Sequence, residues 1–243
     1  MPAEPRAYPA MLVLRDCAVV VIGGGRIATR KVRDLVATGA RVTLISPTLS
    51  APLQRWVREG RVRHLARPYR RGDLKGSRLA IAATPDPHEQ ARIAAEARTT
   101  ATWVNVVDQP ALCDFLAPAV FRRGHLIITV STDGKNPALA RWVKHRLAAL
   151  VGPEYARLTA LLAAVRSALR AAGVPPTARR RMTDRLLDAD LPALVRAKDR
   201  PGIVRLIRRV TGLAHLAPSA RIAGSRRRPT QSRRHASLSP AIR

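Results

Sequence analysis

The sequence predicts an α/β fold in which a parallel sheet with crossover helices is followed by a smaller all-helical part. Three observations predict it. The apolar run Ala18–Ile22 leads into three consecutive glycines and then into a stretch with the apolar spacing of a helix. Further apolar runs alternate with helical stretches as far as residue 107, which is typical of a parallel sheet. Beyond residue 137 the apolar spacing is helical.

The first strand and the turn after it predict a binding site for a dinucleotide. Gly23, Gly25 and Ala28 form the pattern G-x-G-x-x-A between a strand and a helix, as in Rossmann-like domains. The first glycine permits the tight turn, the second lets the backbone approach a pyrophosphate, and the helix N-terminus attracts the anion. An ordinary glycine-rich loop is the alternative. The expected cofactor contacts are Gly23, Gly24, Gly25, Arg26 and Ile27.

The other elements of the first part alternate along the chain. A strand at 41–45 ends at Ser46-Pro47-Thr48, where many dinucleotide folds place an acidic residue for the ribose. No acid is present, so this motif leaves NAD and NADP open, and Ser46, Pro47 and Thr48 are the expected contacts. Residues 8–14 form a lead-in that could add an edge strand. We expect further strands at 62–65, 79–83 and 103–107, and helices at 50–59 and 88–98.

The second part has a different pattern. A β-branched run at 126–130 predicts one more strand, followed by a polar, glycine-bearing loop. The long helical part after it is expected to pack as four helices or to present a face to a partner. The stretch 221–243 carries seven arginines and no acid, and we expect it to be disordered. The predicted helices are at 138–150, 154–172, 178–188, 191–198 and 201–211.

The high positive charge limits the classes of partner. The 243 residues carry 44 basic and 16 acidic side chains, a net charge of +28. A nucleic acid or a small molecule with several carboxylates would explain this charge, and so would a solvated arginine-rich surface. Aromatic residues make up only 3%, too few to favour a stacking platform for single-stranded nucleic acid.

The apolar runs, the first residues and the two cysteines bear on the location and the redox chemistry of the protein. No apolar run reaches the roughly 18 residues of a membrane span, and the first residues lack the apolar core of a signal peptide. We therefore expect a cytoplasmic protein that does not act at a membrane. The two cysteines, Cys17 and Cys113, form neither a disulfide framework nor a metal pattern, so no metal ligands are predicted.

Six segments, in order along the chain, carry a resemblance to a known family. In these segments the chain resembles the precorrin-2 dehydrogenase family, the oxidase and ferrochelatase module of siroheme synthases. The match covers residues 8 to about 150. The part from there to about 215 is helical, as in the family, but carries few recognisable motifs. The segments are Gly23–Lys31, Ala80–Thr84, Val104–Asp108, Cys113–Ala119, Arg123–Leu126 and Val130–Arg141.

The resemblance implies an activity and a division into parts. The implied reaction is the NAD-dependent oxidation of precorrin-2 to sirohydrochlorin, and some family members also insert Fe²⁺ to make siroheme. A homodimer is implied in the same way, with no specific nucleic acid as partner. The implied parts are a Rossmann-like NAD domain at 1–112, a dimerisation segment at 113–150, a helical domain at 151–215 and a basic tail at 216–243.

The resemblance also implies site residues. Asp108 matches the family's catalytic aspartate, which would accept a proton, and Thr84 and Asn105 lie in matching segments as expected cofactor contacts. The tetrapyrrole carries carboxylates around its rim, which gives the basic charge a specific explanation. The residues expected to bind it are Arg122, Arg123, Lys135, Asn136, Arg141 and Lys144.

Two positions depart from the family pattern, and two other functions compete with it. Gln109 stands where members often carry Asp, which removes a carboxylate that could assist metal handling, and Asn136 stands where many carry Ser. Neither touches the hydride acceptor, so dehydrogenation is better supported than iron insertion. A non-catalytic nucleotide-sensing module would explain the glycine turn alone, and a nucleic-acid-binding protein would explain the charge alone.

Overall fold

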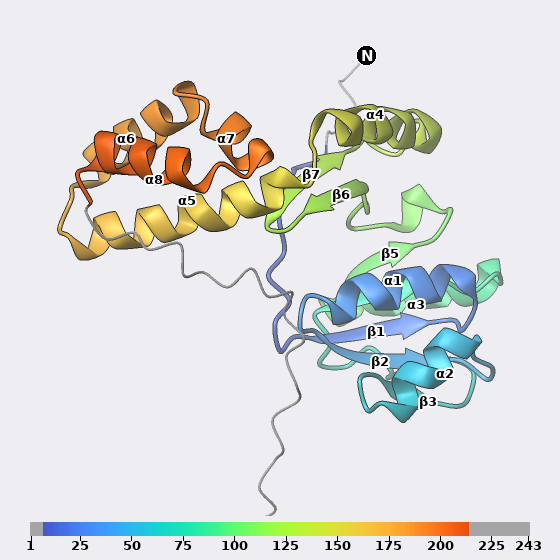
Figure 1. Ribbon diagram of the computed structural model, residues 1–243. Helices are drawn as coiled ribbons and strands as arrows, with labels where there is room; N and C mark the ends of the chain where they lie inside the picture. Colours follow the sequence, from blue (N-terminus) through green and yellow to red (C-terminus); the bar gives the residue numbers. More distant parts are fainter. Residues whose placement is uncertain (1–6, 214–243) are drawn as a thin grey trace, which may run out of the picture. The chain divides into compact units, whose positions relative to one another are not determined.

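Five parallel strands form a sheet in the order β3-β2-β1-β4-β5 in the computed structural model, which describes residues 7–213 (Figure 1). The order reverses beside β1, since β2 pairs with one edge of it and β4 with the other. This is the topology of a Rossmann-like sheet, and it confirms the predicted fold class. The strands are β1 (Ala18–Ile22), β2 (Arg41–Ile45), β3 (Arg63–Leu65), β4 (Leu79–Ala82) and β5 (Trp103–Val106).

Helices cover both faces of this sheet (Figure 1). One face buries Val19 and Val21 of β1 against α1 and α2. The other buries Val20 and Ile22 against α3. Alternate side chains of one strand therefore supply two separate cores, which is why the strand reads as a continuous apolar run. The helices are α1 (Arg26–Val36), α2 (Ala51–Arg58) and α3 (Pro87–Thr99), and the last two lie close to the predicted ranges.

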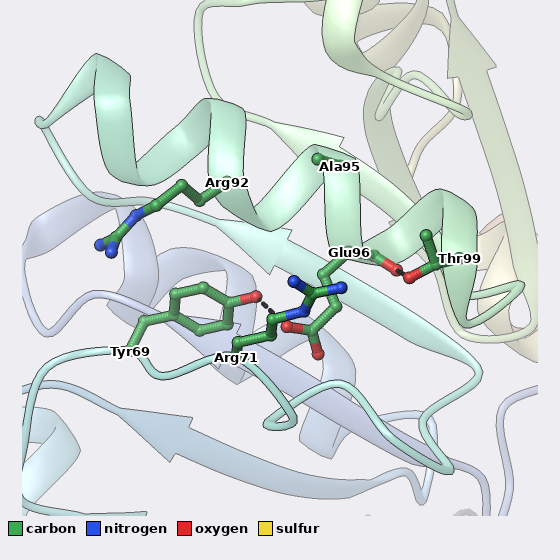
Figure 2. Close-up of a pocket in the computed structure, with 6 residues that line it drawn as sticks. All are labelled: Tyr69, Arg71, Arg92, Ala95, Glu96 and Thr99. Atoms are coloured by element: carbon green, nitrogen blue, oxygen red, sulfur yellow. Dashed lines mark hydrogen bonds between the residues drawn. The ribbon is translucent and has the colours of Figure 1, made fainter.

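A buried carboxylate holds the loop between β3 and β4 against α3. Glu96 of α3 accepts hydrogen bonds from the Tyr69 hydroxyl at 2.6 Å and from the backbone N–H groups of Gly72 and Leu74 at 2.9 and 3.0 Å. Figure 2 shows this pair in a small pocket that Arg71 and Arg92 also line. The polar groups at its base satisfy each other, so we assign the pair a structural role.

The chain after β5 forms a hairpin that the sequence predicted only in part. A short 3₁₀ helix, Pro110–Leu112, precedes β6 (Ala119–Arg123), which pairs with β7 (Leu126–Val130). The expected strand at 126–130 is confirmed, whereas β6 was not predicted. Its alternating half-buried and exposed residues end in two arginines and therefore form no apolar run. The helix α4 (Pro137–Leu150) follows the hairpin.

The chain divides into two compact units. One contains the residues up to Phe121 together with Ile128–Ala149, and the other contains Arg122–Ile127 and the residues from Leu150 onward. The second unit packs four helices around one apolar core that includes Leu158, Leu169 and Leu186, as expected. The helices are α5 (Glu154–Ala171), α6 (Pro176–Asp188), α7 (Leu191–Ala197) and α8 (Arg200–Thr211).

Two expectations on the chain ends have different outcomes. The edge strand expected within 8–14 is wrong, because residues 7–13 are exposed and irregular, and only Leu14 enters the core. The predicted tail at 216–243 lies outside the described residues. Between residues 7 and 213 no single helix is long and apolar enough to cross a membrane, and α4 and α5 meet that criterion only together, as a pair bent by 71° at the break between them.

Candidate functional site

The glycine turn after β1 is wedged between the ends of two neighbouring strands. A Cβ atom on Gly23 would lie 2.5 Å from the carbonyl oxygen of Ala83 after β4, and the φ angle of Gly23 is +112°. A Cβ atom on Gly24 would lie 1.8 Å from the carbonyl oxygen of Thr48 after β2. Only glycine fits at these two positions. The turn therefore stands at the point where the strand order reverses, the usual ligand crevice of an open α/β sheet.

The helix that begins at this turn leaves its N-terminus free for an anion. Gly25 precedes α1 without a side-chain cap, and the first turn of α1 contains no acidic residue. A Cβ atom on Gly25 would meet no protein atom within 4 Å, so the backbone is open there. Uncapped N–H groups and the helix dipole favour a phosphate at this place, which fits the pyrophosphate of a dinucleotide. Arg26 and Ile27 are the first residues of the helix.

The end of β2 offers backbone and hydroxyl groups in place of a carboxylate. The buried Ser46 hydroxyl donates to the carbonyl oxygen of Thr48 at 2.8 Å. The Ser46 carbonyl oxygen lies 2.9 Å from Nε2 of His64 on β3, which must carry its proton there to donate. Pro47 and Thr48 are exposed. These hydrogen bonds hold the turn at 46–48, which packs against Gly24 and which we call the ledge.

The ends of β4 and β5 carry the other predicted site residues. Thr84 is half-buried, and its carbonyl oxygen accepts a hydrogen bond of 2.8 Å from the Gln90 side chain. Asn105 is buried on β5, and its side-chain amide donates to the carbonyl oxygen of Phe115 at 3.0 Å. Asp108 lies two residues beyond β5, is exposed, and has a φ angle of +60°. Because parallel strands share a carboxyl edge, these residues lie on the same edge as the glycine turn.

Two neighbours of Asn105 have structural contacts. Cys113 Sγ accepts from the Val106 N–H at 3.1 Å and lies 3.2 Å from the Val106 carbonyl oxygen, and burial raises the pKa of its thiol. Asp114 accepts a hydrogen bond from the Val104 N–H at 2.9 Å. Both residues tie the 113–115 segment to β5.

The sequence analysis missed one residue beside this edge. Lys31 of α1 is half-buried, and its Nζ atom donates to Asn105 Oδ1 at 3.4 Å. Burial, and the nearby Arg30 charge, lower the pKa of its ammonium group. The available signal was its spacing, since Lys31 falls on the same helical stripe as the buried Ala28, Val32 and Leu35.

The residues expected to bind the substrate lie in both units. Arg122 and Arg123 belong to the helical unit, and Arg123 donates to the carbonyl oxygen of Val151 at 3.2 Å. Asn136 caps α4, since its Oδ1 accepts from the Leu139 N–H at 2.9 Å. The remaining three are exposed or half-buried in the first unit, and their role in binding stays a prediction: Lys135, Arg141 and Lys144.

Comparison with known proteins agrees with this geometry. Residues 10–119 match the family model described as putative NAD(P)-binding. Siroheme synthase of Methylobacillus flagellatus is 41% identical over 162 residues, 67% of this chain and 35% of that protein. Siroheme synthase of Methylococcus capsulatus is 37% identical over 194 residues, 79% of this chain and 41% of that protein. The chain thus spans less than half the length of these relatives.

A solved structure covers more of the molecule. The structure titled SirC, precorrin-2 dehydrogenase, matches 85% of this chain and all of its own with a TM-score of 0.69 and 26% identity. The chain thus shares sequence with the siroheme synthases and its fold with this precorrin-2 dehydrogenase. Because the match covers 85% of the chain, the resemblance seen in six short segments extends to the fold.

Between residues 7 and 213 no group of three or more His, Cys, Asp and Glu side chains is arranged to hold a metal ion.

Proposed function

We propose that this chain catalyses the NAD-dependent dehydrogenation of precorrin-2 to sirohydrochlorin. The observation that carries the proposal is the position of Asp108. It is an exposed carboxylate on the same sheet edge as a glycine turn and an uncapped helix N-terminus that suit a dinucleotide. The siroheme synthase relatives and the SirC structure supply the substrate class.

The proposed reaction removes two hydrogens from the reduced tetrapyrrole. One leaves a carbon as hydride, for which bound NAD⁺ supplies the acceptor, and the other leaves as a proton. Asp108 is the proposed proton acceptor because it is exposed at the end of β5 and an ionised carboxylate can act as a general base. The products are sirohydrochlorin, NADH and the protonated carboxyl group, which releases its proton to water.

The chain's own residues have separate tasks in this proposal. The turn at Gly23–Gly25 and the N-terminus of α1 hold the pyrophosphate, and the ledge at 46–48 contacts the adenosine side. Asn105 and Thr84 border the nicotinamide side. The basic residues at 122–144 receive the substrate's carboxylates through charge-assisted hydrogen bonds.

The test follows both reactants by absorbance. Purified protein with NAD and precorrin-2 should form NADH and the sirohydrochlorin spectrum in equal amounts. Formation of neither would reject the proposal in favour of a non-catalytic nucleotide-binding module. The same preparation with sirohydrochlorin and Fe²⁺, compared with the uncatalysed rate, decides whether the chain also inserts iron as a second substrate.

We also propose that the chain forms a homodimer through α4. Three large apolar side chains of this helix are exposed, with Trp142 at 58% and Leu150 at 74% of full accessibility, and Leu139 at 48%. Burying such side chains against a second copy would remove apolar surface from water. Light scattering should give twice the chain mass, and Trp142→Lys with Leu139→Lys should shift it to the monomer.

A further inference from the structure

Lys31 is a half-buried cation that the proposed reaction does not yet use. It lies one turn after the N-terminus of α1, on the stripe that Ala28 and Val32 bury against the sheet. Burial lowers the pKa of its ammonium group and Arg30 acts in the same direction, whereas Asp34, Cys113 and Asp108 oppose them. Two of these groups lie on its own helix, one in the 113–115 segment and one at the end of β5.

Its contacts connect the two elements that carry the reaction. Lys31 Nζ donates to Oδ1 of Asn105 at 3.4 Å, and Nδ2 of the same amide donates to the carbonyl oxygen of Phe115 at 3.0 Å. A lysine can only donate and a carbonyl oxygen can only accept, so these two partners leave the amide one orientation. Asn105 precedes Asp108 by three residues. One chain of bonds thus joins the dinucleotide helix to the strand that bears the carboxylate.

Placing the charged ammonium group of Lys31 at this position costs desolvation free energy. Taking a charged group out of water costs free energy, and one long hydrogen bond recovers only part of it. An unbranched apolar side chain of similar length would fill the same space without that cost. A partly desolvated charge beside reacting groups is typical of a functional site.

We propose that Lys31 is a positioning residue for the dehydrogenation, in which its ammonium group sets the Asn105 amide and, through it, the end of β5 that carries Asp108. The inference rests on the proposed function, because its effect is on the turnover of precorrin-2. Lys31 itself need not touch either reactant.

The first test compares Lys31→Met with the wild type, with Lys75→Met as the matched control because Lys75 is an exposed lysine of the same unit. We expect Lys31→Met to lower kcat about 10- to 100-fold, the usual effect of misplacing a reacting group. Its melting temperature should equal or exceed that of the wild type, and its Kd for NAD should stay within about twofold. Lys75→Met should match the wild type throughout.

Two results would overturn the inference. One is a kcat of Lys31→Met within about twofold of the wild type. The other is a loss of kcat that accompanies a fall in melting temperature, because that would be a purely structural effect. A wild type that does not turn over precorrin-2 at all would instead reject the proposed function, and the role of Lys31 with it, so the two failures are distinguishable.

The pH profile supplies a readout that a structural role would not change. As pH rises, wild-type kcat should fall where the Lys31 ammonium loses its proton, below the ordinary lysine value of 10.5. Lys31→Arg keeps its charge at every accessible pH, and Lys31→Met has no charge to lose. Both variants should therefore lack this alkaline limb, and an alkaline limb shared by all three proteins would overturn the proposal.

Discussion

Gly24 packs against the carbonyl oxygen of Thr48 so closely that a Cβ atom at position 24 would lie 1.8 Å from it. The contact joins the dinucleotide turn after β1 to the ledge after β2. It means that the shape of the turn depends on backbone atoms from another strand, which cannot move aside as a flexible side chain could. The spacing of the crevice is therefore set by glycine on one side and by a rigid turn on the other.

Gly24→Ala and Gly25→Ala should have different effects. The first introduces a clash with Thr48, so we expect a lower melting temperature and no measurable NAD binding. The second meets no protein atom within 4 Å, so we expect an unchanged melting temperature and NAD affinity at least about tenfold weaker, since the methyl group would stand where the pyrophosphate approaches. Thermal unfolding and calorimetric titration with NAD measure both. Normal NAD affinity in Gly25→Ala would contradict this placement of the pyrophosphate.

Asp108→Asn is the cleanest test of the proton acceptor. The φ angle of Asp108 is +60°, and asparagine tolerates this left-handed backbone better than alanine. The variant should keep its fold and its NAD affinity while kcat falls about 10²- to 10⁴-fold, the range expected for loss of a general base. Steady-state NADH formation is the measurement. Unimpaired turnover in Asp108→Asn would assign the proton acceptor elsewhere.

The Tyr69–Glu96 pair should make stability depend on alkaline pH. Burial, helped by the hydrogen bond to Glu96, raises the pKa of the Tyr69 hydroxyl well above its ordinary 10.0. The unfolded chain loses this proton first, so the free energy of unfolding should decrease as pH rises above 10. Tyr69→Phe should be less stable at neutral pH by about 1.5–3 kcal/mol. Its stability should depend less on pH above 10, and denaturant titrations at pH 8 and pH 11 compare the two proteins.

Tyr8→Phe is the control for that experiment, because Tyr8 is exposed and its removal should reproduce the wild-type profile. Equal pH dependence in wild type and Tyr69→Phe would show that the buried pair does not control alkaline unfolding.

Charge reversal should separate substrate binding from cofactor binding. Arg122→Glu and Arg141→Glu change exposed arginines in the segments expected to receive the substrate's carboxylates. Each should raise KM for precorrin-2 about tenfold or more while leaving the Kd for NAD unchanged. Arg58→Glu, an exposed change at the end of α2, controls for the loss of net positive charge. Unchanged KM in both variants would remove these arginines from the proposed binding set.

Much of the fold was predictable because local patterns and topology agree. Ala18–Ile22 is buried on both faces and therefore had to be apolar at every position, and Gly23 and Gly24 after it had to be small because strand ends stand on either side. The strand β6 was missed because its residues alternate in exposure and end in arginines. The lead-in strand was wrongly expected because Met11 and Val13, although apolar, are exposed.

The sequence by itself determined the dinucleotide turn and the alternating strands and helices, because these depend on residue type and spacing along the chain. Asp108 became the candidate proton acceptor through the resemblance to a known family. Only the tertiary structure decided that Gly24 meets Thr48 and that Lys31 reaches Asn105. These contacts join residues 24 and 74 positions apart in the sequence, and the crossing of α1 over the sheet brings them together. Burial has the same origin, since the cost of the Lys31 charge depends on which groups surround it and not on its neighbours in the chain.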